Sequence, residues 1–299
     1  MRISDTQFSK TMLQSLDHNN AGLGKVMQEM ATGDRLTKLS DDPMATIKLL
    51  NLDREGSAIT QYKTNIANVK TTLSSQEVYL DSVNESLKHM RELVLWGSNG
   101  TMNEDDRQGI VTELYSLRDA MASSFNAQDE EGHYLFSGTK SNEPPLVIQN
   151  GKYVVQGNND KRVVTVAKGV TMESNMTAQD VLDLNGTSDV FNMVDGLIAE
   201  FQNPSPNFRP KVEQALHSVD GTMNNVLAAI TEMGGRHNNL DLMDSAHADN
   251  KLFVDKITSD ISALDYGEAS VRLNNFMAAL QATQASYVKI DDLSLFDRL

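Results

Sequence analysis

Residues 59–94 read ITQYKTNIANVKTTLSSQEVYLDSVNESLKHMRELV, and apolar side chains recur in this stretch every three or four residues. The series consists of Ile59, Tyr62, Ile66, Val69, Leu73, Leu80, Val83, Leu87, Met90 and Val94. Five heptads in register predict one long helix of the coiled-coil type. Gln76 is the polar member of the series, and we interpret it as a marker of register rather than as a functional group.

A second series of the same kind lies in the C-terminal half. It consists of Val212, Leu216, Val219, Met223, Val226, Ile230, Met233, His237 and Leu240. Two long helices, one from each half, predict a mainly α protein built on a coiled-coil helical rod. We interpret His237 as a hydrogen-bonded seam residue, because its nearest histidine, His247, does not share its helix face. Gly234 and Gly235 lie inside this helix, so either the helix breaks there or a neighbour packs closely against the bare backbone, and we favour close packing.

The middle of the chain has a different pattern. Two β-rich runs flank Asn150-Gly151, which is the strongest short hairpin signal, and residues 161–172 supply further strand material. We therefore expect a small β insert between the two helical halves. The expected segments are 1–42 (N-terminal helix and turn), 43–134 (N-terminal half of the rod), 135–205 (β-rich insert with a short helix), 206–249 (C-terminal half of the rod) and 250–299 (C-terminal helix).

Both ends of the chain carry shorter apolar stripes. They consist of Leu13, Leu16, Leu23, Met27 and Met30, and of Leu273, Phe276, Leu280, Tyr287, Ile290 and Leu293. A single helix with an uncovered stripe is marginally stable, because ordering its residues opposes the gain from burial. The two ends therefore predict helices that fold against other subunits of an assembly. A self-contained coiled-coil tether, with its seams closed within one molecule, is the alternative.

Composition excludes several classes of function. The net charge is −15, from 41 acidic and 26 basic residues, which disfavours binding to nucleic acid or to an anionic membrane. Cysteine is absent, so disulfides and thiolate chemistry are excluded. No run of 18 apolar residues and no signal-peptide core occur, so export would need another route. The motifs of nucleophilic, zinc and nucleotide-binding sites are absent. We therefore expect neither an enzyme nor a cofactor.

The segment GDRLTKLSDDP, residues 33–43, contains two adjacent carboxylates. Asp41 and Asp42 could form an acid/base pair, but consecutive side chains diverge. The alternative is a turn between helices, in which Gly33 ends one helix, Asp42 follows Ser40 and Asp41 as the N-cap of the next, and Pro43 is its first residue. We favour the turn. Arg35 could bind these carboxylates or a neighbouring chain, and the sequence leaves this open.

Six motifs together resemble a known family. They are MRIS at the start, TGDRLTKLSDDP at 32–43, SNGTMNEDDR at 98–107, YLFSGTKS at 134–141, MGGRHNNLDLMDS at 233–245 and QASYVKIDDLSLF at 284–296. In this order they resemble the bacterial hook-filament junction proteins, the hook-associated protein 3 family of the flagellin superfamily. By position, Arg35, Asp41 and Asp42 match the family's turn, and Leu293, Leu295 and Phe296 match its C-terminal anchor. Both segments are then expected in a packed inner tube or its adjoining layer.

The resemblance implies a structural role in the extracellular bacterial flagellum. It implies a ring of these subunits at the hook-filament junction, between hook-associated protein 1 and flagellin. It also implies export through the flagellar type III channel without a cleaved signal, with a cytoplasmic chaperone on the C-terminal helix. A minor flagellin of the filament is the alternative within the superfamily. The DDP and SLF segments favour the junction protein over flagellin.

Overall fold

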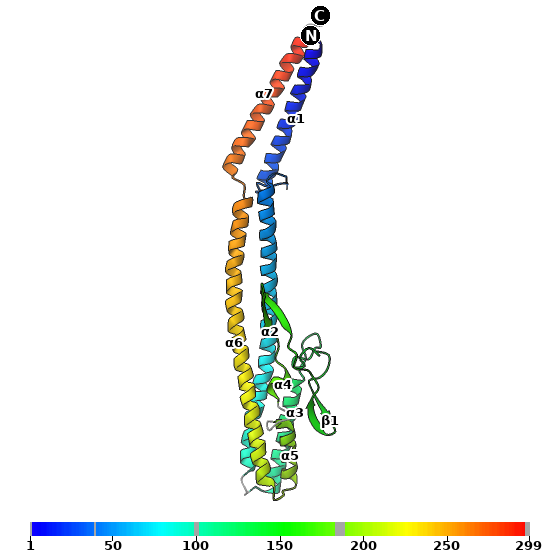
Figure 1. The fold of residues 1–299 in the computed structure, drawn as a ribbon, viewed down its shortest axis with the longest axis vertical. Coiled ribbons are helices and arrows are strands. Elements are labelled where there is room, and N and C mark those ends of the chain that lie inside the picture. Colours follow the sequence, from blue (N-terminus) through cyan, green and yellow to red (C-terminus); the bar gives the residue numbers. More distant parts are fainter. Residues whose placement is uncertain (1, 39, 99–101, 183–188, 297–299) are drawn as a thin grey trace. The chain divides into compact units, whose positions relative to one another are not determined.

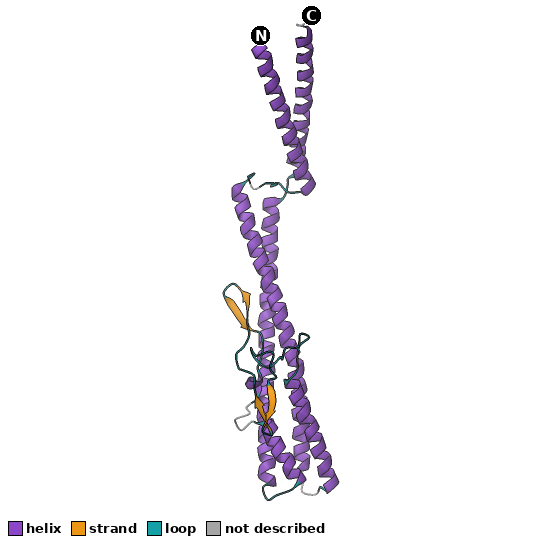
Figure 2. Cartoon of the chain, turned by 90° about the vertical axis from the view of Figure 1, so that its right-hand side faces the viewer, coloured by secondary structure: helices purple, strands orange, loops and turns teal. Residues whose placement is uncertain are grey.

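The computed structural model describes residues 2–38, 40–98, 102–182 and 189–296, with the side chains of 2–6, 8–9 and 290–296 left undescribed. The helices are α1 (Arg2–Thr32), α2 (Pro43–Gly97), α3 (Glu104–Phe125), α4 (Ala178–Val181), α5 (Val190–Gln202), α6 (Phe208–Ser262) and α7 (Tyr266–Phe296). The strands are β1 (Leu146–Gln149), β2 (Lys152–Val155), β3 (Val163–Ala167) and β4 (Val170–Glu173). The fold is mainly α with a small β portion, as predicted (Figures 1 and 2).

The long helices α2 and α6 run antiparallel, and the predicted seams face inward. All members of the α2 series are buried except the half-buried Tyr62. Ion pairs join the outer edges of the same helices, with Lys70 Nζ 2.5 Å from Asp241 Oδ1 and Arg91 Nε 2.7 Å from Asp220 Oδ1. Because these pairs are exposed, most of the stability of the contact comes from the buried seam.

The prediction for Gly234 and Gly235 is wrong. Helix α6 continues through both residues, and an added Cβ at either would have open space within 4 Å. Among the described residues, no neighbour packs against this bare backbone. The helix continues because Met233 and Leu240 are both fully buried on either side, and this burial exceeds the loss of about 1 kcal/mol per glycine in a helix.

The strands form two separate two-stranded antiparallel sheets. β1 and β2 are joined at Asn150 and Gly151, whose φ angles of 53° and 75° are those of a tight hairpin turn. Apolar residues of both hairpins belong to the same core as the helices around them. Tyr153, for example, lies with its ring 4.7 Å from that of Phe191 on α5. The described part of the β insert therefore shares the core of the helices.

Several side-chain amides attach the insert to the helices, and three of them bond to it through both the amide oxygen and the amide nitrogen. Asn126 pairs with the backbone of Leu146 through both its amide oxygen and its amide nitrogen, at 3.0 and 2.8 Å. Asn192 pairs with Tyr153 in the same way, at 3.1 and 3.2 Å. Each amide thereby takes the place that a further strand would occupy at the edge of the hairpin.

Gln76 is the third of these amides. Its oxygen accepts from Met176 N at 2.9 Å, and its nitrogen donates to the carbonyl oxygens of Leu135 and Met176 at 2.7 and 2.9 Å. The side chain is fully buried. The polar break in the α2 series thus holds both ends of the β region, a role that the sequence pattern did not indicate.

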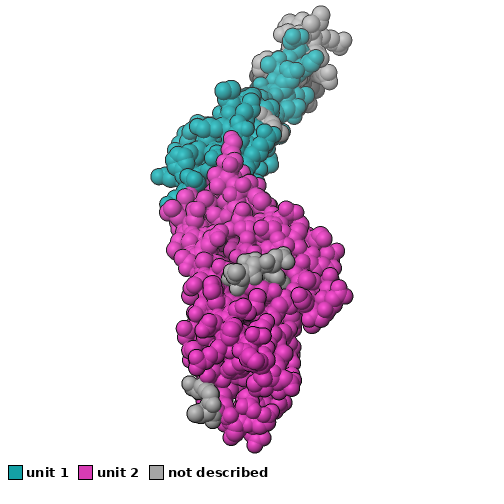
Figure 3. Space-filling view, turned by 60° about the horizontal axis from the view of Figure 1, so that its bottom comes forward, with its two compact units in different colours: residues 1–58, 249–299 teal, residues 59–248 magenta. Residues whose placement is uncertain are grey.

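The chain divides into two compact units (Figure 3). Residues 1–58 and 249–299 form one, called here the terminal unit, and residues 59–248 form the other, called here the central unit. The expected segments had boundaries at 42/43 and 249/250, and the units have theirs at 58/59 and 248/249. The difference arises because the first turns of α2 pack within the terminal unit, where Gly56 faces Val254 of α6.

Candidate assembly interface

The α1–α2 turn is built from local hydrogen bonds. Gly33 has a φ of +77° and its N–H donates to Glu29 O at 2.8 Å, so it ends α1 in the left-handed conformation that glycine favours. Asp42 Oδ1 accepts from Ala45 N at 3.0 Å, which places Asp42 as the N-cap of α2, with Pro43 as its first residue. Ser40 is exposed.

Asp41 has different partners from Asp42. Its carboxylate lies 2.9 Å from Lys25 Nζ and accepts from Thr37 Oγ1 and Lys38 N, both at 3.2 Å. The Lys25 hydrogen bond, chiefly, holds the pKa of the Asp41 carboxyl below its ordinary value. The two adjacent carboxylates therefore serve two ends of one turn and do not share a proton.

Arg35 contacts one of the two carboxylates, as the first of the two alternatives predicted, with its Nη2 3.7 Å from Asp42 Oδ2. Arg35 also bonds to the end of α6. Its N–H donates to Ser262 O at 2.8 Å, and its guanidinium donates to Ile261 O at 3.4 Å. Leu264 N donates in return to Gly33 O at 2.9 Å. The two connecting loops thus pair with each other, and Arg35 satisfies carbonyl oxygens that a helix end leaves unpaired.

Glu29 is a residue of this region that sequence reasoning missed. Its side chain is only 2% exposed, and its carboxylate lies 2.8 Å from Arg272 Nη2 on α7 and 3.9 Å from Lys25 Nζ. Lys25 in turn binds Asp41, so one chain of charges connects α7, α1 and the turn. The sequence does contain a signal for Glu29. It follows Val26 by three residues, so its carboxylate lies on the apolar face of α1.

The apolar contact between α1 and α7 is small. Val26, Leu264 and Ala269 are its buried members, and Met30, Leu273 and Phe276 pack against them. A Cβ added to Gly22 would lie 2.5 Å from the Phe276 ring, so glycine is needed for this approach. Two residues predicted to contact other subunits, Leu273 and Phe276, therefore contact α1 of their own chain.

Other predicted interface residues are less covered. Leu13 and Met27 are 52% and 58% exposed, and Tyr287 is also exposed. Leu16, Leu23 and Leu280 are half-buried. The side chains of Leu293, Leu295 and Phe296 lie outside the described residues. Contact of these residues with another subunit remains a prediction.

The terminal unit exposes more apolar side chains than the sequence analysis identified. Twelve of the 21 exposed large apolar side chains that the structure describes belong to it, although it contains about a third of the chain. Those not predicted are Met44, Ile47, Leu50, Leu252, Phe253, Tyr266, Val271, Met277 and Val288. Such a concentration is typical of a surface that binds another protein.

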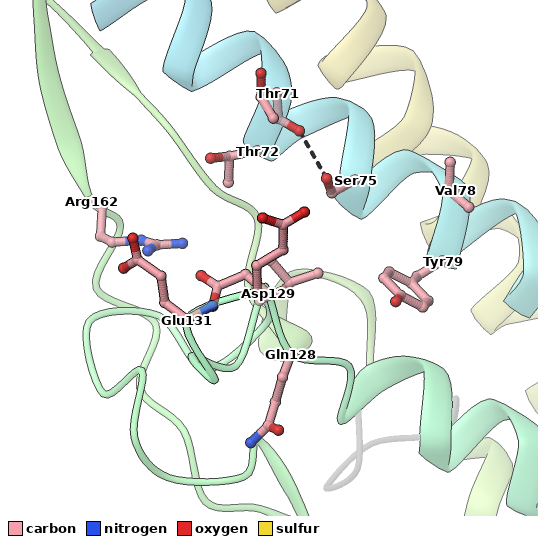
Figure 4. A pocket seen from close by; sticks show the side chains of 11 residues that line it. Thr71, Thr72, Ser75, Val78, Tyr79, Gln128, Asp129, Glu131 and Arg162 are labelled. Atoms are coloured by element: carbon pink, nitrogen blue, oxygen red, sulfur yellow. Dashed lines mark hydrogen bonds between the residues drawn. The ribbon is translucent and has the colours of Figure 1, made fainter.

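The central unit contains an open pocket between α2 and the loop that follows α3 (Figure 4). Ser75 Oγ donates to Thr71 O at 3.0 Å, and Asp129 Oδ1 accepts from the N–H groups of Glu131 and His133. The hydroxyl and the carboxylate are thus engaged in helix and turn structure, and they form no nucleophile–base pair. Within the described ranges, no group of three metal-ligating side chains is assembled.

None of the described helices combines the length and the apolar character needed to cross a bilayer.

Comparison with known proteins identifies the class. The family model for the bacterial flagellin N-terminal helical region matches residues 3–141. Flagellar hook-associated protein 3 of Escherichia coli (strain K12) is 26% identical over 313 aligned residues, covering 99% of this chain and 99% of that protein. The fold and the sequence are thus those of a structural protein of the flagellin superfamily.

Two solved structures add to this comparison. One, described as a flagellar hook-associated protein from Vibrio parahaemolyticus, is 66% identical, with a TM-score of 0.72, and covers 75% of this chain and all of that one. The flagellar junction protein FlgL from Legionella pneumophila has a TM-score of 0.58 at 16% identity, over 74% of this chain and all of that one, and shares the fold. The chain belongs to the flagellar hook-associated protein 3 family.

Proposed function

We propose that this protein joins the flagellar hook to the filament, as a ring of subunits between hook-associated protein 1 and flagellin. The observation that carries the proposal is the concentration of exposed apolar side chains on the terminal unit of a hook-associated protein. Such side chains are stabilised by contact with neighbouring subunits. The Legionella relative is itself described as a junction protein.

The proposal includes export through the flagellar type III channel without a cleaved signal, with a chaperone holding the C-terminal helix beforehand. The small α1–α7 core supports this part, because terminal helices with few buried contacts open at low free energy. The protein then works outside the cell. Its role is structural, with no chemical step.

A truncation tests the junction role. Deleting the codons for Leu293 to Leu299 is expected to release unpolymerised flagellin into the medium, because the C-terminal anchor no longer completes the ring. Extracellular flagellin is measured by immunoblot and filaments by electron microscopy. Val170→Ser, a change to an exposed residue of β4, is the control and is expected to leave filaments intact. Normal filaments on the truncated strain would contradict the proposal.

A second candidate is a minor flagellin of the filament. The match of residues 3–141 to the flagellin N-terminal region favours it. A flagellin would polymerise to filament length when purified alone, whereas a junction subunit stops at a ring. Electron microscopy of the purified chain at high concentration distinguishes the two.

The third candidate is a self-contained coiled-coil tether, and the packing of α7 on α1 within one chain favours it. A tether predicts that the amide hydrogens of α1 and α7 are protected from exchange in the dilute monomer. A junction subunit predicts protection there only after assembly. Hydrogen exchange measured by mass spectrometry decides between them.

A further inference from the structure

The turn between β1 and β2 combines an exposed amide side chain with a glycine that follows it. Asn150 and Gly151 are both exposed, and their φ angles are 53° and 75°. This pair is favoured in a two-residue hairpin turn because both residues tolerate a positive φ. The same pair places a side-chain amide carbon beside the backbone nitrogen of a residue that has no side chain.

The amide of Asn150 differs from the other amides around the β region. Those of Asn126, Asn158 and Asn192 are each hydrogen-bonded to backbone or side-chain atoms. The amide of Asn150 makes no hydrogen bond to the other described residues. Its side chain is therefore free to rotate toward the backbone of the following residue.

The backbone nitrogen of Gly151 is open to such an approach. The strand register pairs Gln149 with Lys152, so the N–H of Gly151 lies outside the ladder of the hairpin. A Cβ added at Gly151 would have open space within 4 Å, so no described neighbour covers this side of the turn. Two further Asn-Gly pairs, at 99–100 and 185–186, lie outside the described residues.

We propose that Asn150 is a site of spontaneous covalent modification, at which the side-chain amide becomes a carboxylate. The Gly151 nitrogen gives its proton to water or hydroxide and forms a bond to Asn150 Cγ. The bond from Cγ to Nδ2 breaks, and the amide nitrogen takes a proton from solvent and leaves as ammonia. The product is a five-membered succinimide ring.

Water then opens this ring at either of its two carbonyl carbons. Opening at Cγ gives aspartate at position 150, whereas opening at the backbone carbonyl gives isoaspartate, in which the chain continues through Cβ and Cγ. No oxidant or reductant is involved. The ring requires a change in backbone angles, and the exposed end of a two-stranded sheet makes such a change at low free energy.

The two products differ in their effect on the hairpin. Both add a negative charge to a chain whose net charge is −15. Aspartate preserves the turn, because Asp-Gly is also favoured in it. Isoaspartate does not, because it lengthens the backbone between Gln149 and Lys152, which pair across the turn.

The amides that attach the hairpin to the helices limit this disruption. Asn126 bonds to both backbone groups of Leu146, and Asn192 bonds to both backbone groups of Tyr153. Strand pairing is therefore lost only in residues 147–152, and the core of the central unit is kept. The proposal is independent of the junction role, because it concerns only this turn and solvent.

Peptide mapping of the full chain tests the site. The protein is incubated at mildly alkaline pH in water enriched in heavy oxygen, which labels each carboxylate formed during the incubation, and is then digested with trypsin. The fragment 141–152 contains Asn150 and also Asn142, which is exposed but is followed by Glu143. Asn150 should be converted several-fold faster than Asn142, to both aspartate and isoaspartate, and faster still as the pH rises. Conversion of Asn150 no faster than that of Asn142 would overturn the proposal.

Two variants test the chemistry and the turn. Asn150→Gln keeps a neutral amide but would need a six-membered ring, so modification at position 150 should fall several-fold. Lys168 and Gly169 form the matching turn of the second hairpin, where both are exposed and Gly169 has a φ of 75°. Lys168→Asn should therefore create a second modified site. Undiminished modification in Asn150→Gln would contradict the succinimide route, and an unmodified Lys168→Asn chain would contradict the role of the turn.

Hydrogen exchange measures the extent of the disruption. Chains that carry isoaspartate at position 150 should lose amide protection in residues 147–152 and keep it around Phe125 and Phe136. Loss of protection throughout the central unit would overturn the confinement to the hairpin tip.

The junction role is tested separately by the strain that lacks Leu293 to Leu299. Its flagellin release does not depend on the state of Asn150.

Discussion

The central and terminal units differ in how each is held together. The central unit has one continuous core that joins α2, α3, α5, α6 and both hairpins, with Phe125, Phe136 and Phe191 packed edge to face. The terminal unit has a buried cluster of three apolar residues and a chain of ion pairs from Arg272 to Asp41. The central unit can therefore be stable alone. The helices of the terminal unit can instead separate and bind another subunit.

The two units also differ in net charge. The central unit carries 25 acidic and 14 basic residues, and the terminal unit carries 16 acidic and 12 basic residues, for net charges of −11 and −4. Lower net charge reduces repulsion between copies. The unit with fewer buried contacts is thus also the unit that copies can approach most readily.

The largest expected effect is in the central core. Phe125→Ala should lower the free energy of unfolding of this unit by about 3–5 kcal/mol, because it removes a fully buried ring and leaves a cavity. Urea denaturation followed by the fluorescence of Trp96, which belongs to the same unit, measures it. The matched change in the terminal unit, Val26→Ala, should cost at most about 2 kcal/mol and leave the Trp96 transition unchanged. Equal shifts of the Trp96 transition in the two variants would show that the two units do not unfold separately.

The next effect concerns the attachment of the β region. Gln76→Ala should destabilise the central unit by about 1–3 kcal/mol, because the N–H of Met176 and two carbonyl oxygens lose their partner in a buried place. Gln61→Ala, at an exposed position on the same helix, is the control and should change stability little. The same denaturation experiment measures both. Loss of amide protection around Leu135 and Met176 in the Gln76 variant would sharpen the assignment.

A smaller effect is expected at the turn of the terminal unit. Asp42→Ala should reduce the stability of the first turn of α2 by about 1 kcal/mol, because Ala45 N–H loses the oxygen that caps it. Ser40→Ala is the control. Hydrogen exchange at residues 43–50 measures the local effect. Faster exchange throughout the central unit would show that the two units do not open independently.

The smallest effect is on pH dependence. Asp41 has a folded-state pKa below the ordinary 3.8, so its bond to Lys25 contributes stability above that ordinary pKa. The contribution is lost as the pH falls through the lower, folded-state pKa. An NMR titration of the Asp41 carboxyl should therefore give a midpoint below 3.8, and Lys25→Met should raise it. A midpoint at or above 3.8 would exclude this ion pair from the terminal unit in solution.

Much of this architecture could be predicted from the residues. The three- and four-residue spacing from Ile59 to Val94 determined α2 and its buried side, because a long helix repeats its faces regularly whatever its surroundings. Asn150-Gly151 determined the first hairpin, and Asp42-Pro43 the start of α2, because turn and cap geometry depends on neighbouring residues.

Only the tertiary structure decided the remaining features. Three pairings join residues that are far apart in the chain: Gln76 with Met176, Arg35 with Ser262, and Glu29 with Arg272. A local sequence pattern carries no information about such contacts. For the same reason the sequence marked apolar stripes at both ends but did not show that Leu273 and Phe276 contact α1, or which side of the terminal helices stays exposed. Periodicity fixes the faces of a helix, and only the arrangement of neighbouring helices decides which face is covered.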